Sequence, residues 1–317
     1  MTLSERRPAL GRPRIDKRPF STVFRKHWQL YLLMAIPIAW MLIFLYAPMY
    51  GVVIAFKNFS VLKGIHGSPW VGFREFERLL GSFQFWNIVR NTVVIAFVRI
   101  GFAFPAAIVL ALALNEMRWM KLRRAVQTIA FAPHFISTVV MAGMILTFLD
   151  PRFGFIGFFF DLLGMETVSL IADPSYFAII YALSEVWQHM GFAAVIYIAA
   201  LSAVDVELYD AARIDGASKL QKIRNVDIPG IRATIVILLI LEIGSAMTLG
   251  FEKVYLLQNP LNLASSEIIA TYVYKIGVLN TNYSLGAAVD LFNGVINLAL
   301  IVSANLLSRR LSEISLW

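Results

Sequence analysis

Long apolar stretches alternate with short polar segments along almost the whole chain. The apolar stretches cover about residues 30–56, 91–114, 125–148, 176–204, 231–249 and 285–307. Each is close to the 20 or so residues that an α-helix needs to cross a bilayer, and the first helix is expected to end near Pro48. The pattern therefore predicts an all-α integral membrane protein with about six transmembrane helices.

Two polar loops carry shorter apolar patterns. In residues 57–85, the apolar side chains of Phe73, Phe76, Leu79 and Leu80 recur at helical spacing among charged residues, which predicts an amphipathic helix at the membrane surface. In residues 149–174 the run FGFIGFFF is too short to span a membrane. We expect both loops to lie outside the bilayer core.

The distribution of basic residues orients the predicted helices. Residues 1–27 hold eight Lys or Arg and three Pro, which is typical of a disordered basic tail. With both termini and the loops 115–124 and 205–229 inside, the inner segments and the adjoining Arg232 hold 19 Lys or Arg, and the outer loops hold seven. This satisfies the positive-inside rule and predicts cytoplasmic N and C termini. Residues 28–317 then form one transmembrane domain.

Composition excludes several classes of protein. The chain is 59% hydrophobic and 15% charged, with a mean hydropathy of +0.70, so it is not an ordinary soluble domain. Its net charge of +8 is spread over short loops, which indicates membrane orientation and not a nucleic-acid partner. It has no cysteine, and it has no P-loop, HExxH or GxSxG pattern. If the protein uses ATP, another chain binds it.

One polar segment stands out in the second half of the chain, DVELYDAARIDGASKLQKIRNVDIP at residues 205–229. Asp205 can cap a short helix, Gly216 fits the left-handed position that ends it, and Ser218 can cap a second helix. Pro229 closes the segment before the next apolar run. Small residues at its centre allow a partner to approach the backbone, which favours a docking element, although a solvated loop would have a similar composition.

The run DAARIDGA at residues 210–217, followed nine residues later by VDIP at 226–229, resembles the EAA loop of permease subunits of binding-protein-dependent ABC importers. The chain departs from that pattern by Asp210 for Glu, Val226 for Ile and Ile228 for Leu. Further similarity covers residues 48–51, 67–72 and the terminal Leu316-Trp317. It points to the sugar-importer branch, and within it to permeases for oligosaccharides such as alginate and pectin fragments.

The resemblance implies a mechanical role for this segment as a coupling helix between the fourth and fifth spans. In the family, the loop inserts into a groove of the nucleotide-binding subunit, and no bond is made or broken there. The residues to which the resemblance assigns this coupling are Asp210, Ala211, Ala212, Arg213, Asp215, Gly216, Ala217 and Pro229.

The resemblance also implies the rest of the assembly. The chain would work in a bacterial cytoplasmic (inner) membrane with a second similar permease, two ABC ATPase subunits that bind ATP and Mg, and an extracytoplasmic solute-binding protein. The chain itself would hold no cofactor and would not be an enzyme. Two unlike permeases are favoured over a homodimer, and an acidic oligosaccharide is one candidate substrate.

Polar residues inside the predicted spans are candidates for a substrate path, because they are costly in lipid unless they face a cavity or a partner. Glu185 and His189 are four residues apart and share a helix face. Asp290, Asn293 and Asn297 form a stripe on the last span. The candidates are Arg99, Glu185, Trp187, Gln188, His189, Tyr197, Asp290, Asn293 and Asn297. Each could instead only join helices, and interhelical pairing explains the charges of Arg99, Glu242 and Asp290 at least as well as substrate contact does. One Glu and one His are too few ligands for zinc, so no metal site is predicted.

Two other classes of function remain open at the level of sequence. An ion-coupled secondary transporter could use Glu185, His189 and Asp290 as a proton relay. Many secondary transporters are built from two internal repeats, and no repeat is evident between the two halves of this chain. An intramembrane enzyme could use Glu185 and His189 as an acid–base pair, but no nucleophile is evident.

Overall fold

A computed structural model describes residues 20–166 and 168–312. The chain divides into two compact units, Met1–Val52 and Val53–Trp317. Among the described residues, secondary structure is helical, apart from a single bridge between Lys57 and Trp70. The first part of the predicted basic tail, residues 1–19, lies outside the described residues.

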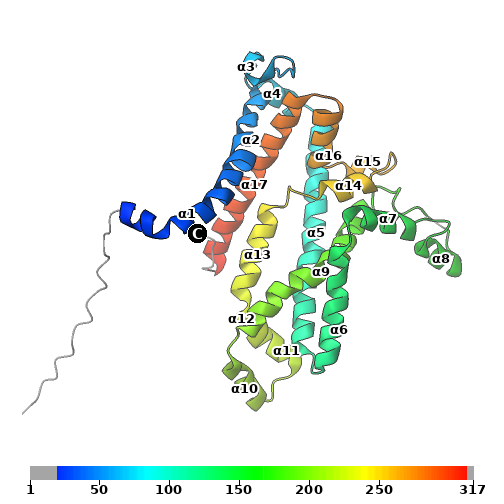
Figure 1. Ribbon diagram of the computed structural model, residues 1–317. Coiled ribbons are helices and arrows are strands. Elements are labelled where there is room, and N and C mark those ends of the chain that lie inside the picture. Colours follow the sequence, from blue (N-terminus) through cyan, green and yellow to red (C-terminus); the bar gives the residue numbers. More distant parts are fainter. Residues whose placement is uncertain (1–19, 167, 313–317) are drawn as a thin grey trace, which may run out of the picture. The chain divides into compact units, whose positions relative to one another are not determined.

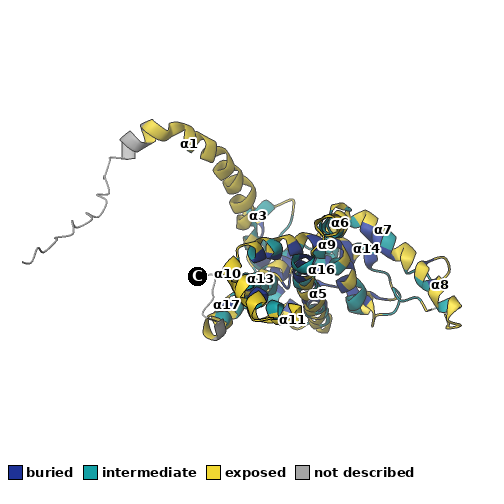
Figure 2. Cartoon of the chain, turned by 90° about the horizontal axis from the view of Figure 1, so that it is seen from below, coloured by how far each residue is buried: buried dark blue, intermediate teal, exposed yellow. Residues whose placement is uncertain are grey.

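The N-terminal unit is one long apolar helix. It comprises α1 (Phe20–Met41), the π-helical turn η1 (Leu42–Tyr46), α2 (Ala47–Met49) and the start of the 3₁₀ segment η2 (Tyr50–Phe56). Its described side chains are exposed along their length (Figure 2), including Leu33 and Ile36. A helix that is apolar on all sides suits a lipid environment.

Two sequence predictions for this unit are wrong in detail. Residues 20–27 are helical, although they were predicted to belong to the disordered tail, and α1 is broken at His27, whose φ/ψ is −122/23°. The helix also continues past Pro48, where it was predicted to end. Pro48 lies in the first turn of α2, where its missing N–H costs little. In an α-helix its ring would clash with the carbonyl group four residues earlier, and that residue lies in the π-helical turn η1, whose hydrogen bonds are not those of an α-helix.

The C-terminal unit holds the remaining elements (Figure 1). Those up to the coupling segment are α3 (Gly64–Gly67), α4 (Arg74–Leu80), α5 (Phe83–Glu116), α6 (Met120–Phe131), η3 (Ala132–Phe135), α7 (Thr138–Phe148), α8 (Phe155–Leu162) and α9 (Phe177–Ser202). Those that follow are α10 (Val206–Ile214), α11 (Lys219–Lys222), η4 (Ile223–Asp227), α12 (Ile228–Gly230), α13 (Arg232–Gly244), α14 (Phe251–Leu257), α15 (Leu263–Ser266), α16 (Ile269–Val273), η5 (Tyr274–Leu279) and α17 (Tyr283–Ser312).

Four helical stretches of the described chain are long and apolar enough to cross a membrane: Lys26–Phe56, Phe83–Glu116, Phe177–Ser202 and Tyr283–Arg310. They correspond to the predicted first, second, fourth and sixth spans, and the helix α4 lies in the loop for which a surface helix was predicted. The protein is therefore a helical membrane protein with four candidate spans, or five if α6 and α7 are counted as one bent span.

The predicted third span is not a straight helix. α6 and α7 meet at an angle of 102°, with η3 between them. Pro133 cannot donate a backbone hydrogen bond, and the Ser137 hydroxyl accepts one from Val140 N at 3.4 Å, which starts α7 in a new direction. Hydropathy alone does not reveal this break, since apolar residues continue through it.

The predicted fifth span is shortened in a similar way. α13 ends at Gly244 after 13 residues, and the chain turns before α14. Asn297 of α17 accepts a hydrogen bond from Met247 N at 3.2 Å and donates one to Thr248 Oγ1 at 3.0 Å. Non-helical backbone is tolerated among apolar helices only when such partners satisfy it.

The core lies where α9 packs along α5, and α6 and α13 contact α9. Most of the buried residues of these four helices lie on α5 and α9. α9 approaches α6 closely at Gly191, where a Cβ would lie 2.0 Å from the Ala130 carbonyl oxygen. This contact places the polar residues of α9 next to the break between α6 and α7.

Candidate functional site

The segment 205–229 forms a helix–turn–helix at one end of the C-terminal unit (Figure 1). Asp205 Oδ1 accepts a hydrogen bond from Glu207 N at 2.9 Å and caps α10. Gly216 has φ of 67°, the left-handed value that the sequence predicted. Ser218 and Gln221 form a capping box at the start of α11. The predicted local structure is confirmed.

α10 presents an exposed surface that combines apolar and charged side chains. It has no buried residue, and its apolar side chains include Ile214, which is 86% exposed. Arg213 Nη1 lies 3.6 Å from Asp210 Oδ1, with both side chains exposed. Of the other predicted coupling residues, Ala211, Asp215, Gly216 and Pro229 are exposed, and Ala212 and Ala217 are half-buried. Solvent-exposed apolar side chains on a charged helix favour contact with a partner protein.

The base of this segment is tied to the last turn of α5. Asp227 of η4 is fully buried, and its Oδ1 accepts hydrogen bonds from Tyr209 Oη at 2.7 Å and Asn115 Nδ2 at 3.3 Å. Burial and this bond raise the pKa of Tyr209 to about 12, so the hydroxyl remains a donor. Lys222 pairs with Glu116, and its Nζ lies 5.4 Å from the centre of the Tyr209 ring.

A second group of charges lies in the middle of the C-terminal unit. Lys253 of α14 is 4% exposed and donates to Glu185 Oε1 and, at 2.7 Å, to Gln188 Oε1 of α9. His189 Nε2 lies 3.9 Å from the same Glu185 oxygen. Gln188 Nε2 also donates to the Ile136 carbonyl at 3.0 Å, at the break before α7. Glu185 and His189 lie on one helix face as expected and approach each other, but Lys253 is the closer partner of Glu185.

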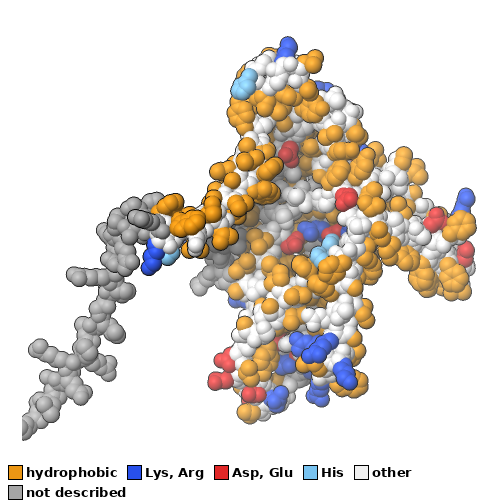
Figure 3. Space-filling model, in the orientation of Figure 1, with side chains coloured by type: hydrophobic (Ala, Val, Ile, Leu, Met, Phe, Trp, Pro, Cys, Tyr) orange, Lys and Arg blue, Asp and Glu red, His pale blue; other side chains and the backbone are white. Residues whose placement is uncertain are grey.

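Two cavities adjoin these charges. One, of about 370 Å³, is lined by Glu185, Gln188, His189 and Lys253 among others. The other, of about 410 Å³, is lined by Tyr197 and by Arg99 and Glu242, whose side chains form an interhelical ion pair at 2.8 Å. Figure 3 shows charged and histidine side chains grouped within a mostly apolar face. Each of the two cations at these cavities thus has a carboxylate partner: Arg99 has Glu242, and Lys253 has Glu185.

His134 of η3 joins this group, although the sequence indicated only a feature of a helix end. Its Nδ1 lies 3.1 Å from His189 Nδ1, so one ring donates and the other accepts. Its ring stacks on Phe192 at 4.1 Å. No group of three or more His, Asp or Glu that could hold a metal occurs among the described residues.

Not every predicted path residue lies in these cavities. Trp187 lines a separate apolar cavity of about 330 Å³ with residues of α7, because it is two positions from Glu185 and faces another side of α9. Asp290 is exposed on α17 and Asn293 is half-buried. Asn297 satisfies the backbone at the break after α13, so its contacts here are structural.

Lys253 and Asp227 are the residues that sequence reasoning missed. Lys253 is the only cation between Arg232 and Lys275, which was a usable signal, but its loop was predicted to face outward. Asp227 was noted only as part of the VDIP run that ends the motif, with no role of its own. In both cases a short polar sequence folds back against a helix distant in the chain.

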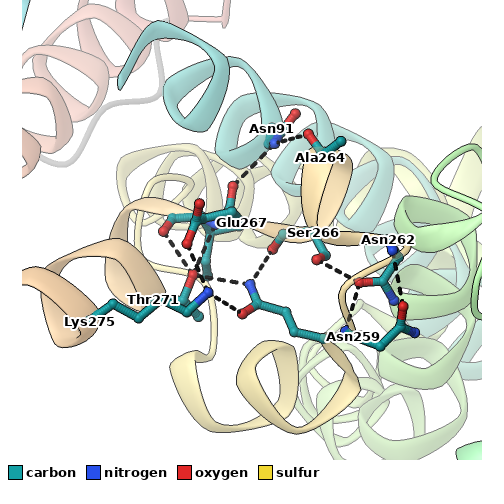
Figure 4. Close-up of polar contacts among 10 residues, drawn as sticks. Asn91, Asn259, Asn262, Ala264, Ser266, Glu267, Thr271 and Lys275 are labelled. Carbon is teal, nitrogen blue, oxygen red and sulfur yellow. Dashed lines mark hydrogen bonds and ion pairs between the residues drawn. The ribbon is translucent and has the colours of Figure 1, made fainter. Parts of the chain in front are cut away.

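The far end of the unit from α10 is held by a network of amide side chains (Figure 4). Asn262 is fully buried, and its Nδ2 donates to the Ile171 carbonyl at 2.8 Å. Asn91 of α5 donates to the Ala264 carbonyl at 2.9 Å, and Lys275 pairs with Glu267 at 2.8 Å. These contacts give residues 256–284, predicted as a loop, an ordered structure.

The fold and the site define a helical membrane protein that carries an exposed helix–turn–helix segment at one end and charged cavities between its helices. Residues 103–313 match the model of the family described as binding-protein-dependent transport system inner membrane component. The chain belongs to this family and is a permease component of such a transport system, which confirms the resemblance drawn from residues 210–229.

The chain is also similar to individual proteins over most of its length. It is 38% identical to Protein LplB of Bacillus subtilis over 92% of both chains. It is 38% identical to the polygalacturonan/rhamnogalacturonan transport system permease protein YteP of the same organism, over 90% of this chain and 88% of that protein. A chain of a bacterial alginate ABC transporter, crystallised with an alginate pentasaccharide-bound periplasmic protein, matches with a TM-score of 0.86 and 34% identity, over 94% of this chain and all of that chain.

Proposed function

We propose that this chain is the transmembrane permease subunit of an ATP-driven importer that moves oligosaccharides from a solute-binding protein into the cytoplasm. The observation that carries the proposal is the exposed helix α10, fixed at its base to α5 and bearing the motif of the family. Similarity to permeases named for polygalacturonan and to an alginate transporter supports the substrate class.

The proposed assembly contains a second, similar permease, two ATPase subunits that bind ATP and Mg, and the binding protein. One docking segment per chain supports two permease chains, because two nucleotide sites must be coupled. An ion-coupled secondary transporter is the alternative, with Glu185 in a proton relay. The contact between Glu185 and buried Lys253 argues against it, because that carboxylate already neutralises a cation.

The proposed topology has six spans, with both termini and the segment 205–229 in the cytoplasm of a bacterial inner membrane. The short α13 and the bent pair α6–α7 supply the two spans beyond the four long helices. The protein has no cysteine, so single cysteines can be introduced and labelled with an impermeant reagent. Lys219→Cys is expected to be labelled only after the membrane is opened, and Arg152→Cys in intact cells. Strong labelling of position 219 in intact cells would contradict the topology.

The proposed substrate is an acidic oligosaccharide. Arg99 and Lys253 each have a carboxylate partner, so a uronate must compete for them, and the resulting weak binding suits passage more than storage. Uronate oligomers with their binding protein are expected to stimulate ATP hydrolysis by the reconstituted complex, and maltodextrins are not. Stimulation by maltodextrins alone would contradict the acidic substrate and leave the permease function standing.

A further inference from the structure

The buried carboxylate of Asp227 needs an explanation. It is fully buried, both donors to its Oδ1 are neutral groups, and its Oδ2 is buried without a hydrogen bond among the described residues. Burying a charged group without full compensation costs free energy, and an apolar residue would avoid that cost. A buried charged residue that lowers stability in this way is a candidate for a role in the mechanism.

The partners of Asp227 come from three elements. Tyr209 lies on α10, Asp227 lies 18 residues later in the π-helical turn η4, and Asn115 lies in the last turn of α5. π-Helical turns occur frequently at functional sites. A second connection, between Lys222 of α11 and Glu116, reaches the same turn of α5. The docking segment is thus joined to one point of the unit through both of its helices.

α5 leads from this point to the charged cavities. It is a single helix over 34 residues, and Arg99 lies 16 residues before Asn115, about 24 Å along the axis. Arg99 lines both cavities and pairs with Glu242 of α13. α5 stays helical from Asn115 to Arg99 although Pro105 lies between them, so a displacement of its end can be passed along the helix.

We infer that Tyr209, Asp227 and Asn115 form a joint that transmits movement of α10 to α5 and so to the interior cavities. This inference rests on the proposed coupling function. Tyr209 and Asp227 are positioning residues, because they act through α5 and do not meet the substrate. The joint lies on the inner side of α10, so its loss leaves the exposed docking face unchanged.

The test uses Tyr209→Phe, which removes only the hydroxyl and keeps the ring beside Lys222. In the reconstituted complex with both permeases, ATPases and binding protein, we expect the ATPases to co-purify in normal amounts. Stimulation of ATP hydrolysis by loaded binding protein is expected to fall about tenfold, within the usual range of coupling energies. Asp227→Asn is expected to act in the same direction, because a neutral acceptor binds the hydroxyl less strongly. The exposed Tyr176→Phe is the matched control.

A double variant tests whether Tyr209 and Asp227 act together or whether each substitution causes a separate defect. If the two groups act as one unit, Tyr209→Phe with Asp227→Asn lowers stimulation no further than Tyr209→Phe alone. Normal stimulation in both single variants would overturn the inference, and so would a loss of assembled complex with normal stimulation in what remains. If variants on the exposed face of α10 also leave coupling intact, the proposed coupling function itself fails.

Discussion

Replacing Lys253 by methionine is expected to lower the free energy of unfolding of the permease by about 3–5 kcal/mol. Lys253 is 4% exposed and is held by Glu185 and Gln188, so its removal leaves the Glu185 carboxylate, which is 14% exposed, with only the more distant His189 beside it. Glu185→Gln is expected to destabilise the protein by a similar amount, because it leaves the ammonium group without a counter-charge. Thermal unfolding of the purified permease in nanodiscs measures both effects.

The double variant Glu185→Gln with Lys253→Met provides the internal check. Since it removes both charges together, its loss of stability should be well below the sum of the two single losses. Lys63→Met, at an exposed position, should leave the unfolding temperature unchanged. Single variants at Glu185 and Lys253 as stable as the parent protein would show that this ion pair does not support the cavity.

Features encoded locally could be predicted from the sequence. The helices α5, α9 and α17 follow from long apolar runs, and the caps at Asp205 and Ser218 and the turn at Gly216 follow from the preferences of those residues. Interhelical pairing of the charges within the spans was also expected, because a lone charge in a span is costly, but the sequence did not decide whether Arg99 would pair with Glu242 or with Asp290.

Features that depend on chain reversals could not be predicted. The breaks after Phe131 and Gly244 lie within apolar runs, and they are stabilised by side chains remote in sequence, such as Asn297. The turn after α13 brings Lys253 to Glu185, 68 residues earlier in the chain. Asp227 and Asn115 are 112 residues apart. Periodicity and hydropathy describe one segment at a time and carry no information on such pairs.

The coupling segment should be sensitive to substitutions that leave its surroundings untouched. A Cβ at Gly216 would meet nothing within 4 Å, so Gly216→Val adds no clash, but φ of 67° is strained by about 1–2 kcal/mol for a β-branched residue. The turn is then expected to change conformation and to mis-aim α10. Asp210→Lys reverses a charge on the exposed face beside Arg213. Uptake in reconstituted vesicles is expected to fall about tenfold or more in both variants.

Two control variants test whether uptake is lost because the backbone conformation or the charge has changed, or because any substitution at these positions abolishes it. Gly216→Asn should retain most of the activity because Asn tolerates positive φ, and Asp210→Glu keeps the charge and matches the residue of the EAA pattern. Membrane insertion and pairing with the second permease should be normal in all four variants, since residues 205–218 contribute little to the buried core. Pull-down of the ATPase subunits, together with ATP hydrolysis and uptake, then shows whether docking or signalling is lost. Full uptake with Gly216→Val and Asp210→Lys would mean that ATP hydrolysis is coupled to transport through another part of the chain.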